Sequence, residues 1–122
     1  MKYTKVTLNK NDFKVRLAKD IITQSIGLMF KKKLKNDEGL LFTFKKTIQF
    51  PVLVSFWMLF TFVPLDIIWI NENKIVVDIA KNTIPWGKKT WLKALTKIYK
   101  SSKPFKYALE IKSGVVNAKI GN

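Results

Sequence analysis

The sequence predicts a mostly-β fold with a minor helical part, and three patterns indicate this class. Short segments near both ends alternate apolar and polar residues, as half-buried strands do. Two apolar runs flank the turn sequence NEN at 71–73, which is typical of a β-hairpin. A long uncharged run at 47–65 contains two prolines and is rich in Val, Phe and Trp, which favour strands. The 122 residues fit one domain spanning 1–122.

Three strands are expected in the first part of the chain. Residues 5–8 and 13–17 alternate apolar and polar side chains around the turn sequence NKND at 9–12. The segment KKKLKNDEG at 31–39 is charged and ends in turn-forming residues, so we predict a solvated connection. LLFTF at 40–44 then predicts the third strand.

An N-terminal helix is expected between the second and third of these strands. Asp20 is a candidate N-cap for the segment IITQSIGLMF. Ile22, Ile26 and Met29 recur within it at helical spacing, which predicts an apolar face.

The second half predicts a hairpin, a basic helix and a last long strand. DIIWI at 66–70 and KIVVDI at 74–79 form the hairpin, and FKYALEIK at 105–112 alternates as a strand. Between Asp78 and Glu110 there are eight lysines and no acidic residue. TWLKALTKIYK in this stretch predicts an amphipathic helix. Its apolar face comprises Trp91, Leu92, Leu95, Ile98 and Tyr99, and its opposite face Lys93, Lys97 and Lys100.

The uncharged run TIQFPVLVSFWMLFTFVPL raises the alternative of a membrane helix. Its length is close to the roughly 20 residues that a spanning helix needs, and lysines flank it. However, Pro51 and Pro64 interrupt it, and its apolar character continues past Asp66 into IIWI. We therefore predict two strand-like pieces divided by prolines, and no transmembrane span.

Composition excludes several classes of enzyme and suggests a class of partner. The chain has neither cysteine nor histidine, so thiolate catalysis, zinc-thiolate sites and Ser-His-Asp triads are excluded. No carboxylates are clustered at a metal-binding loop spacing, and no metal or cofactor is expected.

A net charge of +15 favours anionic partners, namely nucleic acid, anionic lipid or acidic protein. Arg16 is the single arginine, which weakens the nucleic-acid interpretation. The N-terminus has no signal-peptide core, so a cytoplasmic location is expected.

Four segments in order resemble a known family: GLMFKKKLKNDEGLLFTF, FWMLFTFVPLDIIWINENKIVVDI, IPW and YALEIKSGVV. They are similar to the motifs G-L-M-F-R, G-M-L-F, W-M-x-N-T-x-x-P-L-D and L-E-L-x-x-G of the uncharacterised DUF192 family. The resemblance covers about Val15 to Gly121 and implies a small β-barrel-like domain with no established activity. Leu59 and Phe60 stand where the family pattern is polar, and Lys31 where it has arginine.

Candidate ligand-binding residues come from these motifs. They are Trp57, Thr61, Asp66 and Trp86. In one interpretation Asp66 is a base or a ligand anchor and Trp57 a stacking platform. In the other, Asp66 caps a turn through backbone amides with Thr61 as its partner, and Trp57 and Met58 fill core and edge.

The basic helix also allows several interpretations. It can close one end of the barrel, lie in the plane of a membrane surface, or form a basic-aromatic face for nucleic acid. The candidates for an anionic-partner surface are Lys88, Lys89, Lys93, Lys97 and Lys100. We expect a small soluble binding or interaction module rather than an enzyme. The alternatives are a peripheral membrane-surface protein that uses the basic helix and a carboxylate-only enzyme centred on Asp66.

Overall fold

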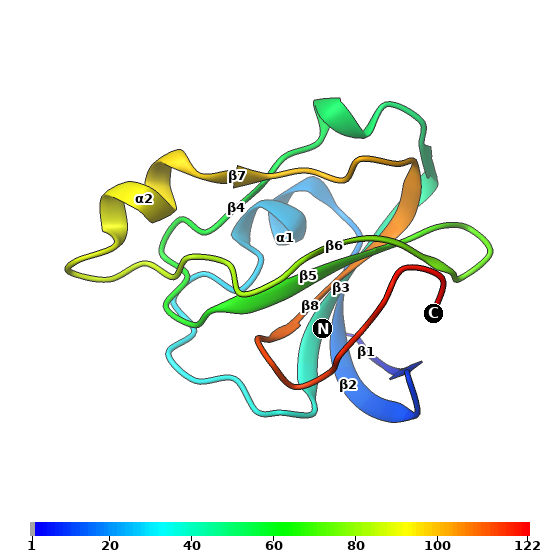
Figure 1. The fold of residues 1–122 in the computed structure, drawn as a ribbon, viewed down its shortest axis with the longest axis horizontal. Helices are drawn as coiled ribbons and strands as arrows, with labels where there is room; N and C mark the ends of the chain where they lie inside the picture. The colour runs from blue at the N-terminus through cyan, green and yellow to red at the C-terminus, as the bar shows by residue number, and fades with distance from the viewer. Residues whose placement is uncertain (1) are drawn as a thin grey trace.

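A six-stranded sheet forms the centre of the computed structural model, which describes residues 2–122 (Figure 1). Its strands, in spatial order, are β1 (Tyr3–Leu8), β2 (Asn11–Ala18), β3 (Glu38–Ile48), β8 (Phe105–Lys112), β5 (Leu65–Ile70) and β6 (Val76–Ala80). All neighbours are antiparallel except β2 and β3, which are parallel. A separate ribbon pairs β4 (Phe56–Trp57) with β7 (Ile98–Tyr99). The helices are α1 (Ile21–Ile26), the 3₁₀ turn η1 (Pro51–Leu53) and α2 (Trp91–Thr96).

The mostly-β class is confirmed, but the predicted barrel is wrong. Within residues 2–122, the edge strands β1 and β6 do not pair with each other, so the sheet stays open. The C-terminal residues instead bond to the first residue of β6: the Val76 N–H donates to the Asn122 carbonyl, and the Gly121 N–H donates to the Val76 carbonyl. This pairing occupies the start of an edge that would otherwise be free to pair with another strand.

The predicted hairpin at 66–79 is confirmed, and the two strands predicted around the turn at 9–12 also pair as a hairpin. Asn9 and Lys10, between β1 and β2, have φ values of 50° and 66°, the positive values that a two-residue hairpin turn requires. Between β5 and β6, the Asn71 side chain accepts hydrogen bonds from the backbone N–H groups of Asn73 and Ile75. Local turn chemistry therefore sets the register of both strand pairs.

The N-terminal helix begins as predicted and ends early. Asp20 is the N-cap, and its carboxylate accepts a 2.7 Å hydrogen bond from the Thr23 N–H. The helix ends at Ile26 because Gly27 adopts φ 53° and ψ −126°, a conformation that residues with a Cβ avoid. The predicted apolar face is not core: Ile22 is 73% exposed, and no residue of α1 is buried.

The basic helix is also shorter than predicted. α2 ends at Thr96, and Ile98 and Tyr99 of the predicted apolar face form β7. Only Ala94 of α2 is buried, while Leu92 is 57% exposed. The helix therefore rests on the protein through a small residue and leaves aliphatic side chains in solvent.

The uncharged run forms the cover of one sheet face. Its two predicted strand-like pieces reduce to the end of β3 and the two-residue β4, because Pro51 starts η1 and the chain then loops to β5. No helix within residues 2–122 is both long and apolar enough to cross a membrane. Phe60 is half-buried. Its ring stacks on the Phe30 ring with 5.3 Å between ring centres, and it meets the Trp86 ring edge-on with 5.0 Å between centres.

Each face of the sheet has its own apolar cluster. One contains Phe42, Trp69 and Phe105 of the sheet together with Phe56, Met58 and Val63 of the run 54–63. The other contains Phe13, Val15, Leu109 and Ile111 and is closed by Val116 and Ala118 of the C-terminal segment. A side chain in the middle of β8 is therefore covered by protein on either face of the sheet.

Gly39 provides a test of how tightly the centre of the sheet is packed. A Cβ on Gly39 would lie 2.7 Å from the Glu110 backbone carbonyl of the central strand β8, which cannot move aside cheaply. We expect Gly39→Ala to lower the free energy of unfolding by about 1–3 kcal/mol, measured by denaturant unfolding. Gly87→Ala is the control, because its Cβ would meet a side-chain atom of Thr90 at 3.1 Å. Equal stability of Gly39→Ala and the wild type would contradict the packing described here.

Candidate functional site

A cavity of about 550 Å³ lies between the sheet, α1 and the β4–β7 ribbon, which lie close together in Figure 1. The apolar walls of this cavity come from Ile21, Ile26, Phe42, Phe44, Phe56 and Ile98. Its polar lining includes Gln24, Ser25, Ser55, Thr61 and Glu110. Mainly apolar walls with a few polar groups are the usual composition of a small-molecule site.

Glu110 is the one titratable side chain among the described residues that line this cavity. It lies in the middle of β8, paired with Leu40 of β3 and Ile67 of β5, and is only 4% exposed. Within residues 2–122, no group donates a hydrogen bond to its carboxyl and no cation forms an ion pair with it. Burial raises the pKa of Glu110 to about 8, because desolvation disfavours the charged form.

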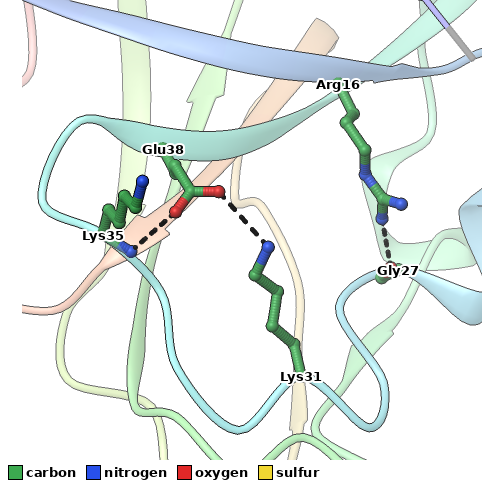
Figure 2. Close-up of polar contacts among 5 residues, drawn as sticks. All are labelled: Arg16, Gly27, Lys31, Lys35 and Glu38. Atoms are coloured by element: carbon green, nitrogen blue, oxygen red, sulfur yellow. Dashed lines mark hydrogen bonds and ion pairs between the residues drawn. The ribbon is translucent and has the colours of Figure 1, made fainter.

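Gly27 brings the end of α1 close to this carboxyl. A Cβ built on Gly27 would lie 3.8 Å from Glu110 Oε1. Its backbone carbonyl accepts a 3.3 Å hydrogen bond from Arg16 Nη2, which ties the turn after α1 to β2 (Figure 2). The Gly27 backbone therefore forms the part of the cavity wall next to Glu110.

Glu38, on the strand next to Glu110, is a fully partnered carboxylate (Figure 2). Oε2 accepts a 3.3 Å hydrogen bond from Lys31 Nζ, and Oε1 accepts a 3.1 Å hydrogen bond from the Lys35 N–H. Partial burial raises the pKa of Glu38, but the Lys35 and Lys31 hydrogen bonds outweigh it and hold this pKa below its usual range. Of the two buried acidic side chains, Asp66 and Glu110, it is Glu110 whose carboxyl lacks a protein partner within residues 2–122.

Two of the four predicted ligand-binding residues meet at this cavity. Thr61 is buried, and its hydroxyl donates to the Leu59 carbonyl at 3.2 Å, which leaves the oxygen lone pairs able to accept. Trp57 in β4 lines the cavity and is 49% exposed. Trp57 therefore lies at the mouth of the cavity.

The other two lie outside the cavity. The buried Asp66 carboxylate accepts hydrogen bonds from the N–H groups of Asn82 at 2.8 Å and Gly114 at 3.2 Å. These bonds join the start of β5 to two loops. The Trp86 ring contacts the Phe60 ring, and its centre lies 6.2 Å from the centre of the Trp91 ring. The predicted set is thus divided between the cavity and its surroundings.

The five lysines predicted as an anionic-partner surface are all exposed and lie in or next to α2. None of them lines the cavity. Lys97 Nζ lies 5.9 Å from the centre of the Tyr99 ring, and Ile98 between them reaches the cavity mouth. Within residues 2–122, no group of three or more acidic residues is placed to hold a metal ion.

Sequence reasoning gave Glu110 no role, because Asp66, Asp78 and Glu110 belong to different strands and their spacing does not indicate paired carboxylates. In FKYALEIK, alternation places Glu110 on the same side as Lys106 and Lys112, which is typical of a solvent-facing side. The sheet is covered on both faces, so this side is buried at Glu110. The signal available was the single acid within the L-E-L motif of the family resemblance.

Glu110 predicts an unusual dependence of stability on pH. From about pH 4.5 to about pH 8, the unfolded chain has released this proton while the folded chain keeps it. The free energy of unfolding should therefore fall as pH rises, by up to about 1.4 kcal/mol per pH unit. We expect Glu110→Gln to remove this slope, measured by denaturant unfolding from pH 5 to about pH 9. Parallel curves for the two proteins would contradict the buried, unpartnered carboxyl.

Two solved structures are similar to the chain over most of its length. A protein from Sinorhizobium meliloti 1021, named a "putative transcription regulator", shares 27% identity with a TM-score of 0.79, over 99% of this chain and 92% of its own. A protein of unknown function from Novosphingobium aromaticivorans DSM 12444 shares 28% identity with a TM-score of 0.72, over 93% of this chain and 74% of its own. No curated protein matches the chain.

The family model that matches is DUF192, whose description reads "Uncharacterized ACR", and it covers residues 4–121. The cavity collects residues from three of the motifs that carry the resemblance: Gly27, the pair Trp57 and Thr61, and Glu110. The match extends over nearly the whole chain, and the protein belongs to the DUF192 family, whose function is unknown.

Proposed function

We propose that the protein is a binding module that holds a small, mainly apolar ligand in the cavity above Glu110. The volume of about 550 Å³ falls within the roughly 300–1,000 Å³ of typical ligand sites. Phe42, Phe44 and Phe56 supply large apolar surfaces, and Trp57 and Ile98 stand at the opening. This combination favours an amphipathic molecule that buries its apolar body.

The observation that carries the proposal is the Glu110 carboxyl. A polar group that is buried without a hydrogen-bond partner costs about 1–3 kcal/mol of stability. The Glu110 residue is 4% exposed and its carboxyl oxygens open onto the cavity, where a ligand group is able to supply the hydrogen bond. Unpartnered buried polar groups of this kind are typical of sites that are completed by a ligand.

Binding is favoured over catalysis by the titratable groups present. Glycoside chemistry needs two carboxyl groups across the substrate, whereas the described lining holds one. Asp66, the centre of the alternative carboxylate-only enzyme, accepts two backbone hydrogen bonds outside the cavity. These bonds suit a structural role for Asp66.

A second candidate function is attachment to an anionic lipid surface through α2. The exposed Leu92, Leu95 and Ile98 accompany the exposed Lys93 and Lys97. Aliphatic side chains next to lysines suit an interfacial helix better than a phosphate-binding face, which is mainly polar. The name of the Sinorhizobium meliloti relative makes nucleic acid the competing partner.

Binding of a neutral apolar dye tests the cavity. We expect Nile red to bind and to gain fluorescence, and Trp57→Ala to weaken its affinity about tenfold because apolar contact area is lost at the mouth. Trp91→Ala is a matched control, since Trp91 is 46% exposed and does not line the cavity. Equal affinities of the two variants, or no dye binding by the wild type, would contradict the proposal.

Vesicle flotation tests the second candidate. We expect binding to vesicles that contain anionic phospholipid, and Leu92→Ser should reduce it several-fold because the exposed leucine loses its contact with the acyl region. Gel shifts with duplex DNA over a salt series should be unchanged by this substitution. If Leu92→Ser has no effect on flotation, α2 does not insert into the interface.

A further inference from the structure

We infer that the ligand is an uncharged molecule with an apolar body and an amide-type group, and that this group pairs with the Glu110 carboxyl at the inner end of the cavity. The inference rests on the proposed function and specifies the chemistry of the ligand. Three observations carry it: the position of the carboxyl, the charges around it and the composition of the walls.

The position of Glu110 opens its carboxyl to a partner on the cavity side. β3 and β5 flank β8 and bond to its backbone, and Gly27 stands beside Oε1. The side chain lines the cavity and has no partner among residues 2–122. A carboxylic acid offers one O–H donor and one carbonyl acceptor side by side, and a carboxamide or lactam presents the complementary pair.

The surrounding charges disfavour a cationic ligand. The chain carries a net charge of +15, which repels cations. By register, Arg16 of β2 lies on the same face of the sheet as Glu110, and its guanidinium is bound to the Gly27 carbonyl. From β3, that face also carries Glu38, which is held by Lys31 and Lys35. Burial raises the pKa of Glu110 to about 8, so pairing with an ammonium group at neutral pH would first require the carboxyl to lose its proton.

The walls disfavour an anionic ligand. No lysine or arginine is among the described residues that line the cavity, so a carboxylate or phosphate would be desolvated without a counter-ion. The lining instead offers the apolar rings of Phe42, Phe44 and Phe56. An uncharged group that both donates and accepts hydrogen bonds meets these conditions.

Displacement of Nile red by matched eight-carbon probes tests the inference. We expect octanamide to displace the dye from the wild type near pH 6.5, and to bind about tenfold more weakly near pH 9.5, where Glu110 is ionised. Octylammonium, with the same chain and a cationic end, should compete poorly at the lower pH. Binding of Nile red without a competing probe tests only the proposed function.

Three variants distinguish the pairing of the amide with the Glu110 carboxyl from binding in the cavity as such. Glu110→Gln keeps a donor and an acceptor, so it should bind octanamide without the pH dependence. Glu110→Leu should lose about tenfold in octanamide affinity and keep Nile red binding. Glu72→Gln, at an exposed carboxyl outside the cavity, should behave as the wild type.

The outcomes distinguish failure of the inference from failure of the proposed function. If Nile red binds but octanamide affinity is the same in the wild type and Glu110→Leu, the amide pairing is wrong and cavity binding stands. If octylammonium binds more tightly as pH rises and loses affinity in Glu110→Gln, the ligand is a cation and the inference is overturned. If neither dye nor probe binds, the proposed function fails.

Discussion

Burial of the central strand β8 is the constraint on which the rest of the structure depends. β3 and β5 pair with both of its edges, and an apolar cluster covers each face. Gly39 lets β3 approach the Glu110 backbone closely. A polar side chain in the buried middle of β8, residues 108–111, must therefore find a partner inside the protein or in a cavity, and Glu110 has only the cavity.

The cover over this site depends on an unusual backbone. Phe60 has φ 51° and Phe30 has φ 64°, a left-handed region that costs a bulky residue energy and suits asparagine. The family pattern has asparagine at position 60. Here the Phe60 carbonyl accepts a hydrogen bond from the Phe30 N–H at 2.8 Å, and its ring packs between Phe30 and Trp86. The contacts of the Phe60 ring with Phe30 and Trp86 thus offset the backbone strain at Phe60. They also cover a side chain that makes the run 47–65 unusually apolar.

The two proposed binding functions meet at β7. Ile98 reaches the cavity mouth, and the exposed lysines and aliphatic residues of α2 lie immediately before it in the chain. Exposed Ile21 and Ile26 of α1 also line the cavity. An amphipathic ligand that partitions into lipid would therefore enter beside the residues proposed to contact a lipid surface, so the two functions are physically compatible.

The sequence by itself determined the features that depend on neighbouring residues: the two hairpins, the Asp20 cap and the strand at 105–112. Turn residues, caps and alternation act over a few positions, so they are readable without the fold. The open sheet and the exposed apolar face of α1 were decided by the tertiary structure, because they depend on which distant segments pair and which face is covered. The same holds for Glu110: alternation placed it with lysines on a polar side, and only the packing of α1 and residues 54–61 over that side buried it.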